Sequence, residues 1–457
     1  MTIVREPAAA RTIAVTAPAG GLLLVKALVV VAMFSGFINL IPAGEFMPAT
    51  FLIDSIIAAM ALLAFIALCR GASLEFWMIA LILLLVASVV LMLQGPEAVG
   101  PQFRAVRNQV FYAFAGLYTA VAVRDRDGAM SIMTLVMRLG LVLAAFGCVQ
   151  FFFRDVLPEW LLFSRDTILF SYYGTDISRS TGLVGNSIIF ATLLVLIYSL
   201  WLAQALWRPR VMTFANAALM AAGIVTTFSR ASILCAALIS FCMLAAVLWR
   251  IRPSRRIPLL ASLSLAGALL AIGFIGNESW RDTLTGSFIW KGLFLGENAT
   301  AAGSNKRHYQ YATFAIESFS RHPVFGIGLG TQSQYSENAM SSVVITDGFH
   351  YSTLVEGGLF LFLPTLLFLL AVIFRAVRAY HSFPLSFKHI PFAIAIYFFS
   401  QVAIAGFINT GFYGKVANLI GWIVFGAMVA LARANTAEGA LTQALKRDVC
   451  RTRYCST

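Results

Sequence analysis

The chain has 457 residues, of which 60% are hydrophobic and 12% are charged, and its formal net charge is +13. Soluble domains carry about 25% charged residues, so this composition excludes an ordinary soluble protein. The apolar residues form blocks of roughly 18–25, the length that a helix needs to cross a membrane. We therefore expect an all-α polytopic membrane protein, with residues 1–457 as a single integral membrane domain.

The apolar blocks predict about twelve transmembrane helices. We place them at residues 21–43, 50–69, 75–94, 108–123, 130–153, 183–207, 211–229, 231–249, 257–276, 353–375, 389–410 and 415–433. An even number of spans puts both termini on the same side of the membrane.

The basic residues indicate which side that is. With both termini in the cytoplasm, more than half of the 33 lysines and arginines fall in cytoplasmic segments, as the positive-inside rule requires. The clearest marker is the run from Arg250 to Arg256, and residues 434–457 become a basic cytoplasmic tail. Topology thus accounts for the positive charge, and no nucleic-acid partner is expected. Residues 154–182 and 277–352 form two outer loops.

The larger outer loop, residues 277–352, contains a pattern of its own. Apolar residues recur at helical spacing from Arg307 to Ser320, Pro323 ends that pattern, and the glycine-rich stretch from Gly326 to Gly330 follows as a turn. The pattern predicts an amphipathic helix beside the membrane rather than a passive connector.

Three arginines are candidates for binding a phosphate or diphosphate at the outer surface. Arg230 lies between two predicted spans with almost no loop around it, Arg179 precedes the sixth span, and Arg307 begins the amphipathic helix. A guanidinium group holds phosphate oxygens through paired hydrogen bonds. The alternatives are a snorkelling side chain for Arg230, an interfacial anchor for Arg179 and a solvated loop charge for Arg307.

Three further side chains lead into the tenth predicted span and are candidate general bases. They are Asp347, His350 and Glu356. A carboxylate or an imidazole at the water boundary can accept a proton from a reacting hydroxyl. The alternatives are an ordinary loop histidine and a carboxylate that is satisfied by backbone groups at the start of a helix. The cysteines show no metal-ligand spacing, so neither a metal nor a cofactor is expected.

Four short patterns, in this order, resemble those of the bacterial O-antigen polymerase and ligase superfamily. They are the Arg-x-x-Gly of Arg179 to Gly182 with Asn186 after it, the Ser-Arg of Ser229 and Arg230, the arginine, helix and Pro-x-x-Gly-x-Gly of Arg307 to Gly328, and the Glu-x-Gly of Glu356 to Gly358. Each pattern is weak alone, whereas their order and spacing together are specific.

The resemblance implies a metal-independent glycosyltransferase with the all-helical architecture called the C type. Such enzymes take a glycan from undecaprenyl diphosphate at the periplasmic face of the bacterial inner membrane, so residues 277–352 would be a periplasmic loop. Arg230 and Arg307, with Arg179 in the same cavity, would stabilise the charge that develops on the diphosphate. The acceptor would be a second lipid-linked glycan for a polymerase, or lipid A-core for a ligase.

One departure from the family pattern favours the polymerase branch. Ligases share a His-Asn pair about nine residues before the glutamate, whereas this chain has Asp347 and Gly348 there. A polymerase would work with a chain-length regulator as its protein partner. Ligases that glycosylate proteins form a third branch. A transporter is the hypothesis from another class, and it predicts charges near the midplane and two pseudo-symmetric halves.

Overall fold

The computed structural model describes residues 20–39, 48–94, 99–162, 170–172, 175–177, 179–250, 299–332, 348–408 and 414–454. The helices are α1 (Gly21–Met33), α2 (Ser35–Ile38), α3 (Pro48–Cys69), α4 (Phe76–Gln94), α5 (Val99–Val106), the π-helical turn η1 (Arg107–Phe111), α6 (Ala113–Ala122), α7 (Arg126–Phe152), the 3-10 turn η2 (Glu159–Leu161), α8 (Ser187–Trp207), α9 (Val211–Thr226), α10 (Arg230–Arg250), α14 (Ala299–Arg321), α15 (Phe349–Ser382), α16 (His389–Ser400), the π-helical turn η5 (Gln401–Ala405), α17 (Gly406–Ile408) and α18 (Lys415–Tyr454). Strands β1 (Phe170–Tyr172) and β2 (Thr175–Ile177) form one antiparallel hairpin.

This architecture confirms an all-α polytopic membrane protein. Within the described ranges, eight helices are long and apolar enough to span a membrane, and α1 and α9 are shorter apolar helices. The predicted span at residues 257–276 lies outside the described residues. Twelve spans therefore stays a prediction.

Two predicted spans differ in length from the helices that contain them. In the first, residues 21–43, α1 ends at Met33 and α2 follows after a turn in which Gly36 N donates to Leu183 O at 3.0 Å, and residues 40–43 lie outside the described residues. The last predicted span, 415–433, agrees with the apolar stretch Lys415–Thr436, and α18 continues beyond it to Tyr454 through a segment that contains several of the helix formers alanine, leucine and arginine. The amphipathic helix of the large loop is confirmed as α14, which begins before Arg307 and ends ahead of Pro323.

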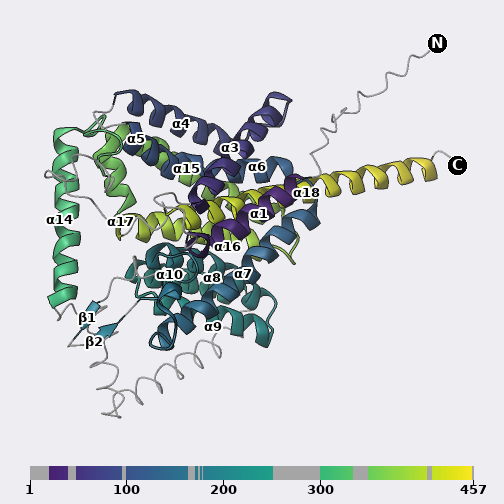
Figure 1. Cartoon of the computed structure of the whole chain (residues 1–457). Helices are drawn as coiled ribbons and strands as arrows, with labels where there is room; N and C mark the ends of the chain where they lie inside the picture. Colours follow the sequence, from purple (N-terminus) through teal and green to yellow (C-terminus); the bar gives the residue numbers. More distant parts are fainter. Residues whose placement is uncertain are drawn as a thin grey trace.

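Helix α18 is the centre of the bundle (Figure 1). Its apolar part is 94% buried, and it packs on α6, α7 and α8. A side chain added at Gly116 would come within 2.5 Å of Trp422 O, so only glycine permits α6 to lie this close to α18. Small residues at such crossings are a common means of packing membrane helices.

The antiparallel order of the helices gives the bundle two distinct ends. Helices α8, α10 and α15 begin at the end that we call the site end, where α14 and the hairpin also lie (Figure 1). The opposite end, which we call the basic end, collects arginine and lysine residues near the ends of the apolar spans and in the short connections. They include Arg70, Arg124, Arg208, Arg210, Arg375, Arg378, Lys388 and Arg433. The long extension of α18 projects from this end (Figure 1).

Candidate functional site

The turn between α9 and α10 positions Arg230. Phe228 adopts a φ of 51°, which an L-residue rarely does and which marks local strain. Ser229 N donates to Thr227 Oγ1 at 3.3 Å, and Ser229 Oγ donates to Ser232 Oγ at 2.9 Å. These bonds tighten the turn, so that Arg230 becomes the first residue of α10 at the site end.

Arg179 docks on the same turn from the segment that precedes α8. Its Nε donates to Thr227 O at 2.7 Å, and the next residue, Ser180, donates its N–H to Thr226 O at 3.0 Å. The hydroxyl groups of Ser180 and Thr226 also lie 2.8 Å apart. Two stretches that are far apart in the sequence therefore meet residue by residue at this point.

Gln150, near the end of α7, holds the Arg179 segment in place. Its Oε1 accepts from Gly182 N at 2.8 Å and from Thr181 N at 3.2 Å. Gly182 has a φ of 57°, and a side chain there would strike the ring of Phe190. The Arg-x-x-Gly pattern thus needs its glycine for a turn. The sequence did not predict this role of Gln150, because nothing distinguishes it from other single glutamines in apolar helices.

The positive charges of Arg179 and Arg230 at this turn favour the binding of an anion. Only 9% of Arg179 is exposed. Burial, and then repulsion from the nearby Arg230 guanidinium, lowers the pKa of Arg179 to about 10. Neighbouring guanidinium groups at the site end are candidate contacts for an anionic group. Arg307 lies on α14, and its side chain is outside the described residues.

Glu356 anchors the glycine-rich turn against α15. Its Oε1 accepts from Gly330 N at 3.1 Å and from Gln332 N at 3.2 Å, and its Oε2 accepts from Gln109 Nε2 at 3.4 Å. Only 5% of the residue is exposed. Glu356 therefore lies where backbone groups satisfy it, which is the structural alternative that its sequence position left open.

The turn and the helix share a glycine interlock. Gly326 has a φ of 66°, and a side chain there would come within 2.5 Å of the backbone of Glu356. On α15, Gly358 breaks the helix with a φ of 54° and a ψ of −149°. Because of this break, the next two amides of α15 donate to Pro323 O and Val324 O, both at 2.9 Å. The Pro-x-x-Gly-x-Gly and Glu-x-Gly patterns are thus two halves of one contact.

His350 joins α15 to η5 rather than facing open solvent. Its Nε2 donates to Val402 O at 2.8 Å, and its ring lies 4.2 Å from that of Phe349 and 4.6 Å from that of Phe407, between centroids. Only 4% of the residue is exposed, and Nδ1 has no hydrogen bond within the described part of the chain. Asp347 lies outside the described residues.

The segment η5 also connects the two halves of the site. On the side opposite His350, Ser400 O, immediately before η5, accepts from Cys235 Sγ at 3.4 Å, little more than one turn along α10 from Arg230. The starts of α10 and α15 therefore flank one π-helical turn at the site end. Such turns are rare and occur often at functional sites.

The second π-helical turn, η1, makes contacts that the sequence did not suggest. Arg107 pairs with Asp54 at 3.1 Å, Asn108 O accepts from Asn418 Nδ2 at 2.8 Å, and Gln109 reaches Glu356. Three consecutive residues thus bind three different helices. An extended apolar pattern from residue 108 had predicted an ordinary span, and nothing in it marks a π turn.

Two further observations concern metal binding and cavities within the described ranges. No group of three His, Cys, Asp or Glu side chains there is placed to share a metal ion. A cavity of about 870 Å³ lies at the basic end, across the bundle from Arg230, and is lined by residues such as Glu75, Arg375 and Arg433.

The comparison with known protein families identifies one match. Residues 215–366 match the family model described as O-antigen ligase. The matched segment contains most of α9, α10, α14, the glycine-rich turn and the first part of α15. No curated protein matches the chain.

Proposed function

Because this chain belongs to the O-antigen ligase and polymerase superfamily, we propose that it is a membrane glycosyltransferase that polymerises lipid-linked oligosaccharide repeat units. The donor is a glycan on undecaprenyl diphosphate, the acceptor is a second lipid-linked glycan, and the product is an O-antigen or an exopolysaccharide. The enzyme works without a metal, at the periplasmic face of the inner membrane, with both termini in the cytoplasm.

The observation that carries the proposal is the meeting of Arg179 with Arg230 at a strained, hydrogen-bonded turn, of which Arg230 lies within the matched residues 215–366. Two neighbouring guanidinium groups can hold phosphate oxygens through paired, charge-assisted hydrogen bonds. A diphosphate, with several anionic oxygens, suits such a pair. The basic residues at the opposite end support the orientation, because the positive-inside rule assigns that end to the cytoplasm.

In the proposed reaction, a hydroxyl oxygen of the acceptor forms a bond to the anomeric carbon of the donor sugar. The bond from that carbon to the diphosphate oxygen breaks, and its electron pair leaves with the diphosphate. Arg179 and Arg230 hold the diphosphate and stabilise the charge as it grows, an effect worth about 3–4 kcal/mol for one well-placed donor. The hydroxyl proton passes to a base or to the departing diphosphate.

The contacts of Glu356 and His350 bear on which residue acts as the general base. Glu356 accepts three hydrogen bonds from protein groups, and His350 is enclosed by aromatic rings. Neither is well placed to meet an acceptor hydroxyl. We therefore assign the general base to Asp347, if the reaction uses one. The enclosure of His350 also supports a polymerase, because a ligase would present a histidine to its acceptor.

An assay in membranes separates the two branches. Vesicles containing the full chain are supplied with purified lipid-linked repeat units, with and without lipid A-core, and the products are sized on a gel. We expect a ladder of longer lipid-linked glycans that needs no lipid A-core. Transfer to lipid A-core without elongation would instead identify a ligase, and an unchanged donor would contradict glycosyl transfer.

A further inference from the structure

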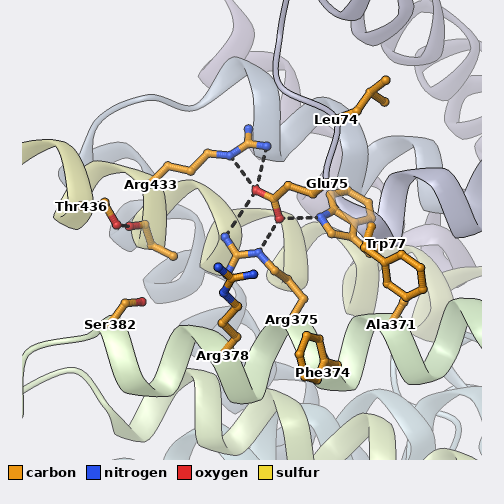
Figure 2. Close-up of a pocket in the computed structure, with 12 residues that line it drawn as sticks. Leu74, Glu75, Trp77, Ala371, Phe374, Arg375, Arg378, Ser382, Arg433 and Thr436 are labelled. Atoms are coloured by element: carbon orange, nitrogen blue, oxygen red, sulfur yellow. Dashed lines mark hydrogen bonds and ion pairs between the residues drawn. The ribbon is translucent and has the colours of Figure 1, made fainter.

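The cavity at the basic end is lined by three arginines and one glutamate (Figure 2). Its walls are the start of α4, the last turns of α15 and the part of α18 around Arg433. From Gly358 to Arg378, α15 rises by about 30 Å, at about 1.5 Å per residue, which is the thickness of a bilayer core. The cavity is therefore at the membrane surface opposite to the candidate active site.

Two of the arginines already share the one carboxylate. Arg375 pairs with Glu75, and Arg433 Nη2 lies 2.9 Å from Glu75 Oε1. Trp77 Nε1 also donates to Glu75 Oε2 at 3.0 Å (Figure 2). Although partial burial alone raises the pKa of Glu75, the two arginines hold that pKa below its ordinary value. The Glu75 carboxylate is thus ionised, and both of its oxygens have partners.

The third arginine leaves the cavity with surplus positive charge. Arg378 lies one turn after Arg375 on α15 and is exposed, and no carboxylate within the described residues is close enough to pair with it. Three arginines and one glutamate give the lining a net charge of +2. Guanidinium groups with donors to spare are suited to phosphate oxygens. The hydroxyl groups of Ser382 and Thr436, also in the lining, are further donors.

The same cavity carries an apolar surface. Leu74, Phe76 and Phe374 line it, and 62% of Phe374 is exposed. Exposed aromatic and aliphatic side chains directly beside arginines are what the boundary between lipid headgroups and acyl chains requires. A soluble anion would contact the arginines only and would leave these side chains without a partner.

From this geometry we propose that the cavity binds the phosphate headgroup of an anionic phospholipid, with Arg378 as the principal contact and Phe374 against the acyl chains. Basic pockets between transmembrane helices bind such headgroups at the cytoplasmic side of a membrane. A lipid held here joins α4, α15 and α18 at the end of the bundle opposite to the active site. The proposal does not depend on the glycosyl transfer described above.

The test uses the purified full chain in detergent, native mass spectrometry and thermal unfolding. Phosphatidylglycerol, phosphatidylcholine and inorganic phosphate are titrated in separate arms. We expect phosphatidylglycerol alone to be retained and to raise the melting temperature. The variant Arg378→Gln should bind it about tenfold more weakly, a difference of about 1.4 kcal/mol, because the variant loses a charge-assisted contact to the phosphate. Arg378 has no ion pair to lose within the described residues, so the variant should fold normally.

The matched control is Arg210→Gln, an exposed arginine of the basic end that does not line the cavity. It should bind phosphatidylglycerol as the unmodified chain does. Equal loss in both variants would show a diffuse charge effect and would overturn the site. Equal stabilisation by phosphatidylcholine would show that the cavity does not select an anionic headgroup. Equal stabilisation by inorganic phosphate would show that the ligand need not be a lipid. Either result would overturn the proposal.

Discussion

At the scale of single residues, the site depends on the positive charges of Arg179 and Arg230. Arg179 is buried beside Arg230, and its Nε is committed to Thr227 O. The repulsion from Arg230 contributes to the lowered pKa of Arg179, and a bound diphosphate would offset it.

This repulsion predicts a measurable response to a diphosphate. Inorganic pyrophosphate at ten times its Kd should raise the melting temperature of the full chain by roughly 2 °C. The variant Arg230→Gln should not respond, whereas Arg210→Gln should respond fully. An equal response of Arg230→Gln would separate Arg230 from the binding of phosphate.

The contacts of Glu356 predict a difference between two substitutions. Glu356→Gln retains the oxygen that accepts from Gly330 and Gln332, and Gln109 can rotate its amide so that Oε1, which has no partner among the described residues, accepts from the new amide. Glu356→Ala leaves two buried N–H groups unpaired, at a cost of about 2–6 kcal/mol.

We therefore expect normal protein levels and most of the activity for Glu356→Gln, and loss of folded protein for Glu356→Ala. Membrane abundance and glycan synthesis are measured together. If Glu356→Gln accumulates normally but is inactive, Glu356 acts as the base, and its anchoring role is secondary.

At the scale of elements, the site is made from interlocked turns. The glycine-rich turn and the break in α15 exchange backbone hydrogen bonds, and both use glycines with positive φ. The alanine variant of Gly326 tests this interlock. The position requires a positive φ and has no room for a side chain, so Gly326→Ala should be destabilised by the backbone strain, about 1 kcal/mol, and further by the collision with α15.

Gly71 is the matched control for this prediction. It has a φ of 95°, but a side chain there would meet nothing within 4 Å. Thermal unfolding should show a clearly larger loss for Gly326→Ala than for Gly71→Ala. Equal losses would mean that strain alone acts and that the turn is not locked against the helix.

Some elements of the site could be predicted from the sequence, and others could not. Arg179, Arg230 and the glycines belong to short local patterns, and the structure brings Arg179 and Arg230 together. Gln150, Asp54 and Arg107 act through partners 30 or more residues away, and such pairings leave no local trace. The π-helical turns were missed because hydrophobic periodicity does not distinguish them from α-helix.

At the scale of the whole molecule, the two ends of the bundle have different chemistry. The site end holds turns, the hairpin and α14, and the basic end holds the arginines of the short connections. Hydrophobic blocks were enough to predict this division, because the cost of charge in a bilayer fixes where basic residues lie. The extent of α18 beyond its span was not predictable from hydropathy alone.

This division predicts the orientation of the chain. Val156 follows α7 at the site end, Val211 begins α9 at the basic end, and both are largely exposed. In spheroplasts, a membrane-impermeant thiol reagent should label Val156→Cys but not Val211→Cys, relative to the unmodified chain. Both should react after the membrane is permeabilised. Labelling of Val211→Cys alone in intact spheroplasts would invert the topology and move Arg230 to the cytoplasmic face.

If Arg230 holds the diphosphate of a lipid-linked glycan, its loss should change the size of the glycans that cells make. Cells producing Arg230→Ala are compared with cells producing Arg210→Ala, at equal membrane abundance, and both lipid-linked and finished polysaccharide are separated on a gel. We expect single repeat units to accumulate and long chains to disappear with Arg230→Ala, whereas Arg210→Ala should give the normal pattern. An unchanged pattern with Arg230→Ala would show that Arg230 does not hold the diphosphate.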